Sequence, residues 1–501
     1  MRRRDFLKMG TAAAVATAAG QSAKAKTKSR PKTRKPNVLF VFSDQHRAFS
    51  LPGEPFNQAL APNLDAFREQ NCSMEQCVSN YPLCSPYRAI LMSGLYSQQN
   101  GVLRNVDTLN PSVCQPLGET FRNAGYHTGY IGKWHIHGQE SINRADEDFI
   151  PKGPYRMGFE DWHVWADTDD HYHGFTFNQE TGEKIYPEGW APVRMTDEAI
   201  DFLKAQPKDK PWFLVLSWNP PHPPFDPPED DKAPYPLDSI KFRPNVHLAP
   251  NASEIQQGAR SDSALRKSAQ GYMGGITGVD KEFSRVLQAL EATGQAEDTI
   301  VIYTSDHGEM MGSQGLMGKR VPYEESCRVP FFIRYPGVTP DRHKADTLFA
   351  AIDIYPTLCG MAGVPIPQHC AGRDLSDVMR GRRIQEPENV FLLSQNVARV
   401  SRPANQNAAA GKANANGAGG GESGCPNYRG VRTKKHTYVV ADTGRWLLYD
   451  NIADPYQMKN LVADPSQKAL MESLDTKIEA WLSSVKDTFP YAAAKTEIYS
   501  I

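Results

Sequence analysis

Five short segments of this sequence concentrate side chains that can bind anions or metal ions. One of them is PLCSPYRAILMSG, in which the thiol of Cys84 stands four residues before the guanidinium of Arg88, at the start of an apolar stretch with helical character. The N–H groups of a helix start and a nearby arginine both attract negative charge. Cys84 is therefore either a packed core residue or the centre of a reaction on an anion.

The other four segments are apolar runs that end in polar residues. They are NVLFVFSDQHR with Asp44 and Gln45, HTGYIGKWH with Lys133 and His135, WFLVLSWNPPHPPF with His222, and DTIVIYTSDHGE with Asp306 and His307. Short continuous apolar runs predict buried strands, here over 38–42, 212–218 and 299–304, with a fourth strand ending at Lys133. Each polar cluster thus follows directly on a strand.

Helical patterns lie between these runs; one over 282–293 has apolar residues at three- and four-residue spacing and a glycine after its last residue. Strands alternating with helices predict an α/β fold with a large, mostly parallel sheet sandwiched by helices. Ligands bind such sheets outside the carboxyl ends of the strands. We therefore expect all the polar clusters to meet at one sheet edge, in a catalytic domain over residues 37–380.

Residues 381–501 predict a smaller C-terminal α+β subdomain with an antiparallel sheet. YRGVRT, HTYVVAD and RWLLYDN are short strand patterns with a hairpin turn at 442–444, and an amphipathic helix is predicted over 467–485. A low-complexity loop of Ala, Asn and Gly over 402–424 precedes these strands. We expect this subdomain to serve as structural cover and as one wall of the cleft.

The N-terminus has the features of an export signal. Residues 1–25 hold paired arginines, a short alanine-rich run and a small-residue cleavage pattern, which predict a twin-arginine signal, followed by a basic linker over 26–36. The alternative is a disordered basic tail. The signal predicts that the twin-arginine export machinery carries the folded protein to the bacterial periplasm or beyond.

Charge and hydropathy restrict the partners. The formal net charge is -1, and removing residues 1–25 changes it to -5, so no global basic field attracts nucleic acid. No later segment approaches the roughly 20 apolar residues of a membrane-spanning helix, so we expect no stable membrane insertion. Eight irregularly spaced cysteines do not form a disulfide scaffold, although one or two bridges are compatible with export. Cys72 and Cys77, spaced as on one helix face, are expected to be buried small residues.

Each polar residue alone has an ordinary explanation, because an aspartate can cap a helix, a histidine among prolines can close a loop, and a cation can be solvated. Together they predict a divalent cation beside an anion pocket. Asp44, Gln45, Asp306 and His307 offer mainly oxygen ligands, which suit calcium better than zinc. The residues expected around a tetrahedral oxyanion are Arg88, Lys133, His135, His222 and Lys319. The predicted reaction is hydrolysis of a sulfate or phosphate ester by a nucleophile on the chain.

At this point the sequence resembles the type I sulfatase family of the alkaline-phosphatase-like superfamily. Cys84 to Arg88 matches the family signature C-x-P-x-R, and GYHTGYIGKWH, residues 125–135, matches the family's G-Y-x-T-x-x-x-G-K-W-H at every fixed position. The resemblance extends from NVLFVFSDQ to LYDNIADPYQMKNL, over nearly the whole exported chain.

The resemblance implies a cofactor built from the chain itself. A formylglycine-generating maturation enzyme would oxidise Cys84 to formylglycine (3-oxoalanine), whose hydrated form attacks sulfur and also contacts the metal. Asp306 and one calcium ion would activate the attacking hydroxyl. Arg88 and Lys133 would hold the diol and neutralise developing negative charge.

The resemblance also implies proton-transfer and binding roles. His222 and Lys319 would bind the sulfate oxygens, and one of them would protonate the leaving alcohol. His135 would help take a proton from the second hydroxyl, so that sulfate is expelled and the aldehyde returns.

Two positions depart from the family pattern, and a third residue has no clear counterpart. Many sulfatases have two adjacent aspartates after the first strand, whereas this chain has Asp44 and Gln45, so the metal site would carry one negative charge fewer. Tyr87 replaces a small residue beside the nucleophile, where it is expected to line the substrate pocket. His137 has no clear counterpart and is either structural or part of a subsite.

The segment FEDWHVWADTDDHYHGFTFN, residues 159–178, is rich in aromatic, acidic and imidazole groups and is either a carbohydrate subsite or a structural loop. With export, it favours a sulfated sugar or polysaccharide as substrate. The alternatives are a phosphate or phosphonate monoester hydrolase of the same superfamily and a catalytically idle relative that binds sulfated glycans.

Overall fold

The computed structural model describes residues 34–51, 53–137, 149–165, 170–248, 261–395 and 425–498. The predicted export signal over 1–25, most of the linker over 26–36 and the loop over 402–424 lie outside the described residues. Within these ranges, every helix is too short or too polar to cross a membrane.

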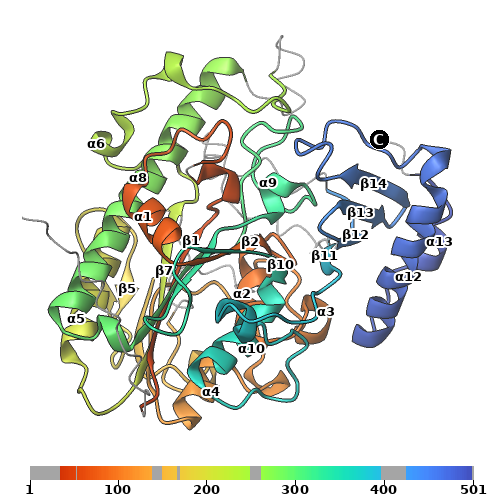
Figure 1. The fold of residues 1–501 in the computed structure, drawn as a ribbon. Helices are drawn as coiled ribbons and strands as arrows, with labels where there is room; N and C mark the ends of the chain where they lie inside the picture. Colours follow the sequence, from red (N-terminus) through yellow and green to blue (C-terminus); the bar gives the residue numbers. More distant parts are fainter. Residues whose placement is uncertain are drawn as a thin grey trace, which may run out of the picture. The chain divides into compact units, whose positions relative to one another are not determined.

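A ten-stranded sheet forms the larger part of the fold, in the order β10-β2-β9-β8-β1-β7-β3-β4-β5-β6 (Figure 1). Its central neighbours run parallel and are β8 (Thr299–Ser305), β1 (Asn37–Asp44), β7 (Trp212–Pro221) and β3 (His127–Lys133). These are the four strands predicted from the sequence, which are thereby confirmed. Because they are parallel neighbours, their carboxyl ends lie at one edge.

The outer strands make the sheet mixed. They are β2 (Cys72–Val78), β9 (Phe331–Arg334), β10 (His343–Ala350), β4 (Asp161–Trp165), β5 (Thr176–Phe177) and β6 (Lys184–Ile185). β9 is antiparallel to both β8 and β2. Cys72 and Cys77 are buried as expected, but their assignment to a helix face is wrong, because both lie in β2. No disulfide joins the eight cysteines, all of which are described.

Helices cover both faces of the sheet, as predicted. In β1 the side chains alternate, so that Phe40 and Phe42 enter one hydrophobic cluster while Leu39 and Val41 enter the other. The second cluster is covered by α1 (Pro62–Gln70), α5 (Ala191–Ala205) and α8 (Asp262–Ala292). The first is covered by α2 (Cys84–Ser93), α4 (Leu117–Asn123) and α10 (Ala351–Ala362) (Figure 1). Shorter helices are α3 (Ser97–Asn100), α6 (Glu229–Lys232), α9 (Glu324–Cys327) and α11 (Ser376–Met379).

Helix α8 begins twenty residues before the helix predicted over 282–293. Its middle contains four glycines between residues 271 and 278, which weaken both helix propensity and the apolar period. Tertiary packing explains them: a Cβ on Gly271 would lie 2.1 Å from the carbonyl oxygen of Phe225. The glycine-rich part of α8 therefore seats the proline-rich loop that follows β7.

The C-terminal region contains a four-stranded antiparallel sheet, β11 (Val390–Ser394), β12 (Tyr428–Arg432), β13 (His436–Ala441) and β14 (Gly444–Asp450). It packs with α12 (Lys468–Val485), and α13 (Tyr491–Ala494) follows. The predicted antiparallel strands and closing helix are confirmed, while β11 was not predicted. The boundary at residue 381 stays a prediction, because Tyr428 and Trp481 belong to the same hydrophobic cluster as one face of the large sheet.

Candidate active site

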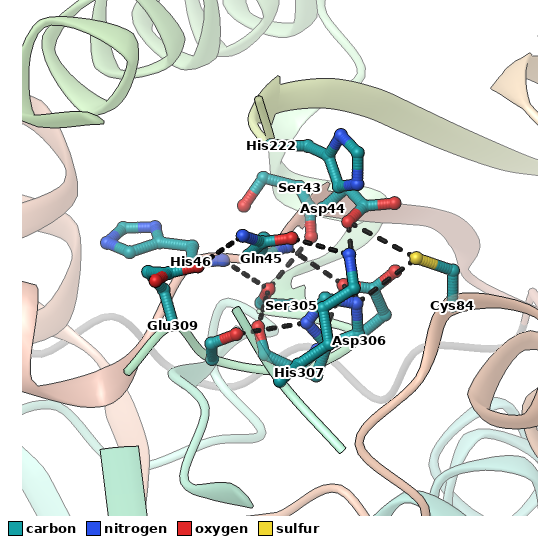
Figure 2. Close-up of polar contacts among 12 residues, drawn as sticks. Ser43, Asp44, Gln45, His46, Cys84, His222, Ser305, Asp306, His307 and Glu309 are labelled. Carbon is teal, nitrogen blue, oxygen red and sulfur yellow. Dashed lines mark hydrogen bonds and ion pairs between the residues drawn. The ribbon is translucent and has the colours of Figure 1, made fainter. Parts of the chain in front are cut away.

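The predicted polar residues converge at the carboxyl edge of the central strands (Figure 2). Asp44 ends β1, Asp306 and His307 follow β8, and Cys84 is the first residue of α2. One donor atom from each of these four side chains lies within 4.8 Å of the other three, and all four residues are buried. Four of the five predicted metal-ligating residues therefore form one cluster.

His307 presents a lone pair to this cluster. Its Nδ1 lies 3.0 Å from the carbonyl oxygen of Gly308, to which the neutral ring donates its N–H. Its Nε2 lies 3.2 Å from Cys84 Sγ and 3.6 Å from Asp44 Oδ1. Burial lowers the pKa of His307, which favours the neutral form that can ligate a metal.

The two carboxylates are held by different partners. Asp306 Oδ1 accepts hydrogen bonds from the backbone N–H groups of Gln45 and His307, both at 2.9 Å. Burial alone would raise the pKa of Asp44, but the charge of Lys133, followed by smaller contributions that include Arg88, holds it well below its usual range. Asp44 is therefore an anion at neutral pH.

Arg88 extends from α2 into the carboxylate pair. Its Nη2 lies 3.1 Å from Asp44 Oδ2 and 3.2 Å from Asp306 Oδ2. Its Nη1 donates to the carbonyl oxygen of Lys133 at 2.6 Å and to Ser217 Oγ at 2.8 Å. Ser217 was not predicted, although its hydroxyl interrupts the apolar run of β7 and was a visible signal.

Two lysines add positive charge to the cluster. Lys133 Nζ lies 2.8 Å from Asp44 Oδ2. Lys319 Nζ donates to Gln45 Oε1 at 2.7 Å. Burial alone would lower the pKa of Lys319, but its electrostatic interactions with Cys84 and then with Asp44 raise it. Both lysines are therefore positioned to attract an anionic substrate.

His222 belongs to the same electrostatic environment. Its Nδ1 lies 2.6 Å from the carbonyl oxygen of Pro223 in the loop after β7. Burial, and then the charges of Lys319 and Lys133, lower its pKa well below the usual value. His135 is only partly buried, and its backbone carbonyl accepts a hydrogen bond from Ser85 Oγ, next to Cys84.

Gln45 adopts a left-handed backbone conformation, with φ of 74°. Its side-chain Oε1 accepts from Lys319, and its Nε2 donates to Glu309 Oε2. Glu309 is 1% exposed and was not assigned a role from the sequence, although it stands in the segment DTIVIYTSDHGE.

The expected role of Tyr87 in lining the substrate pocket is not supported. Tyr87 is fully buried in the hydrophobic cluster under α2, where its ring packs near that of Phe42. His137 lies against the ring of Tyr155 at 5.1 Å.

The segment over 159–178 is mainly structural in its aromatic part. Phe159, Trp162 and Trp165 are each less than 5% exposed, and Trp162 packs 4.8 Å from Trp134. Buried rings cannot stack on a sugar, so the structural alternative holds for them. Residues 166–169 lie outside the described residues, and the side chain of His173 is exposed.

Comparisons with known proteins agree with this geometry. The family model named Sulfatase matches residues 36–364, more than half of the chain. The chain is 32% identical to an ulvan-active sulfatase of Formosa agariphila, over 91% of this chain and 82% of that protein. It is 30% identical to an endo-4-O-sulfatase of Bacteroides thetaiotaomicron, over 94% of this chain and 96% of that protein.

Solved structures share the fold. A Bacteroides thetaiotaomicron structure from research on the metabolism of multiple glycosaminoglycans has a TM-score of 0.77 at 28% identity, covering 92% of this chain and 98% of that one. A phosphonate monoester hydrolase of Agrobacterium radiobacter has a TM-score of 0.71 at 23% identity, which shows the fold alone, over 90% of this chain and 96% of that one. From the family match and the two close relatives, the chain belongs to the sulfatase family, of the alkaline-phosphatase-like superfamily.

Proposed function

We propose that this sulfatase releases sulfate from a sulfated carbohydrate by means of a formylglycine made from Cys84. The observation that carries the proposal is the position of Cys84, at the first turn of α2 and within one buried cluster with Asp44, Asp306 and His307. A reactive group placed there meets the ligands of a cation on one side and the start of a helix on the other.

The donor set fits one calcium ion. Asp44, Asp306, His307 through the lone pair of Nε2, and the group derived from Cys84 would hold the ion, and Gln45 would add its amide oxygen. Oxygen-rich sites favour hard cations such as Ca²⁺. When bound, the ion supplies positive charge that stabilises negative charge on substrate and nucleophile, while the formylglycine supplies the attacking oxygen.

The cationic side chains bind and orient the anion. Arg88 is fixed by four hydrogen bonds, so its guanidinium is preorganised before substrate arrives. Lys133 and Lys319 provide the remaining positive charge, and His222 and Lys319 contact the sulfate oxygens. One of these two would protonate the leaving alcohol, and His135 would accept a proton from the nucleophile.

The names of the relatives support a sulfated carbohydrate as substrate. An ulvan-active sulfatase and an endo-4-O-sulfatase are each at least 30% identical to this chain, and each is matched over more than four fifths of its length. We infer the same chemical class for this chain, a sulfate ester on a sugar.

Mass spectrometry of the peptide that contains Cys84 tests the nucleophile. Protein produced together with a formylglycine-generating enzyme should carry an aldehyde in place of the thiol, and should release sulfate from sulfated polysaccharides. Cys84→Ala is the matched inactive control. An unmodified thiol in a protein that hydrolyses sulfate esters would refute the nucleophile, and faster turnover of aryl phosphonates than of aryl sulfates would refute the reaction.

We further propose twin-arginine export to the periplasm or the medium, on the strength of residues 1–25. Replacing Arg2, Arg3 and Arg4 by lysine should keep the protein in the cytoplasm of a bacterial host, as measured by fractionation. Export at an undiminished level would contradict this assignment.

A further inference from the structure

We propose that Glu309 is a positioning residue that fixes the orientation of the Gln45 side-chain amide and thereby makes Gln45 a metal ligand. This inference deepens the proposed function, because it rests on the proposed calcium site. Figure 2 shows Gln45 between Glu309 and the buried pair of Asp44 and Asp306. Nothing in the sequence pattern alone distinguishes which end of the amide faces the cluster.

The contacts of Glu309 use both of its oxygen atoms. Oε1 accepts from the backbone N–H groups of Met311 and Gly318, each at 2.8 Å. Oε2 accepts from Gln45 Nε2. The side chain is buried and receives three N–H donors, so it acts purely as an acceptor here.

An acceptor-only neighbour decides which way an amide points. The NH2 end of Gln45 must face the Glu309 carboxylate, and its Oε1 must then face the other way. There, Lys319 Nζ donates to Oε1 at 2.7 Å. The reversed amide would place its oxygen against the Glu309 carboxylate and its NH2 against the Lys319 ammonium. Neither neighbour could then form a hydrogen bond with it.

Glu309 also holds the segment that carries Lys319. Its bond to the N–H of Gly318 fixes the residue directly before Lys319, and the N–H of Met310 donates to the carbonyl of Gly318 at 2.8 Å. The contacts form a closed circuit from Glu309 to Gln45, to Lys319, to Gly318 and back. One carboxylate therefore positions both a proposed ligand and a proposed substrate-binding cation.

The circuit also accounts for a glutamine beside Asp44. A carboxylate at position 45 would face Glu309 directly and the two negative charges would repel each other. With glutamine at position 45, the negative charge is carried by Glu309, which lies behind Gln45 as seen from the proposed ion. Gln45 still offers a carbonyl oxygen as a ligand. This charge arrangement predicts that positions 45 and 309 can be exchanged as a pair but not singly.

Glu309→Gln tests the orientation. The N–H groups of Met311 and Gly318 require an acceptor, so the introduced amide must keep its oxygen on them and turn its NH2 toward Gln45. Gln45 must then rotate its own oxygen toward that NH2 group, away from Lys319. Calorimetric titration with Ca²⁺ should show affinity reduced by about 10- to 100-fold, as for the loss of other groups that orient ligands.

The paired exchange Gln45→Glu with Glu309→Gln is the rescue. The carboxylate introduced at position 45 can accept from the amide introduced at position 309 and still present an oxygen to Lys319, so most of the lost Ca²⁺ affinity should return. Gln45→Glu alone should be the least stable variant in thermal unfolding. Asp475→Asn, at a buried acid in the C-terminal region, is the matched control and should leave Ca²⁺ affinity unchanged.

Two results would overturn the proposal: parental Ca²⁺ affinity in Glu309→Gln, or a double variant no better than Glu309→Gln. If either single variant fails to fold, the thermal stability of the double variant tests the proposal. The proposed pairing requires the double variant to be more stable than each single variant. Neither measurement needs a substrate, so loss of the proposed sulfate hydrolysis would be seen separately. If the parent binds no Ca²⁺, the metal site fails and the unfolding comparison alone judges the pairing.

Discussion

Arg88 Nη2 lies 3.1 Å from Asp44 Oδ2, and the two side chains are 1% and 0% exposed. A buried ion pair is stable only when its remaining polar atoms are also paired. Here, both terminal nitrogens of the guanidinium are paired, because Asp306, Ser217 and the carbonyl of Lys133 also accept from them. The pair is thus part of a rigid network that links α2 to β1, β3, β7 and the residue after β8.

Replacing Arg88 by lysine should damage both activity and stability. Lysine has one ammonium and cannot contact Asp44, Asp306, Ser217 and the Lys133 carbonyl together. We expect kcat to fall by about 100-fold or more, and the free energy of unfolding to fall by about 3 kcal/mol. Steady-state kinetics and chemical denaturation measure these effects. Arg104→Lys, in a partly exposed pair with Asp107, is the control and should change kcat and stability little. Near-parental kcat and stability in Arg88→Lys would contradict the role assigned to the Arg88 network.

Replacing His222 by alanine should separate substrates by their leaving groups. A poor leaving group, such as a sugar alkoxide, needs a proton in the transition state, whereas a nitrophenolate does not. If His222 is the proton donor, kcat for sugar sulfates should fall by about 100-fold or more, with a much smaller loss for nitrophenyl sulfate. Equal losses of kcat for sugar sulfates and for nitrophenyl sulfate would instead make Lys319 the proton donor. Lys319→Ala is the companion variant that tests this alternative.

His46 should contribute to acid sensitivity. Burial lowers the pKa of His46 to about 3, whereas an unfolded histidine has a pKa of about 6.5. Between these values the unfolded chain binds a proton that the folded protein excludes, so stability falls as the pH falls from about 6.5 toward 3. In His46→Asn the free energy of unfolding should depend less on pH, by up to about 1.4 kcal/mol per pH unit in that window. If the free energy of unfolding falls with pH equally steeply in the parent and in His46→Asn across this range, the role assigned to His46 is refuted.

Gly271→Ala should disturb the site from a distance. The new methyl group would lie 2.1 Å from the carbonyl oxygen of Phe225, so the loop that carries His222 must shift. A displacement of this kind can cost about 100-fold in kcat, and thermal unfolding should show a modest loss of stability. Gly275→Ala is the graded comparison in α8: its nearest atom, Cα of Pro221 at the end of β7, would be 3.3 Å away, so a smaller displacement and a smaller loss are expected. If both variants behave alike, the close approach at Gly271 is not needed for activity.

Much of the fold could be predicted because its signals are local. The runs that became β1, β3, β7 and β8 are apolar on both faces, as strands covered by helices on both sides must be. Their polar residues begin where the strands end, and parallel neighbours place those ends together. The helix α8 was half missed, since its glycines serve a contact with a loop some fifty residues earlier in the chain.

The sequence by itself determined which residues could take part in the chemistry: Cys84 and Arg88 at a helix start, and Asp44, Lys133, His222 and Asp306 at or after strand ends. Only the tertiary structure decided how they are oriented. It turned Tyr87 into the core, brought Ser217 to Arg88, and placed Glu309 against Gln45. The physical reason is that residue type and spacing fix the available donors and charges, whereas burial and hydrogen-bond direction depend on contacts between segments distant in the sequence, such as the 129 residues between Arg88 and Ser217 and the 264 between Gln45 and Glu309.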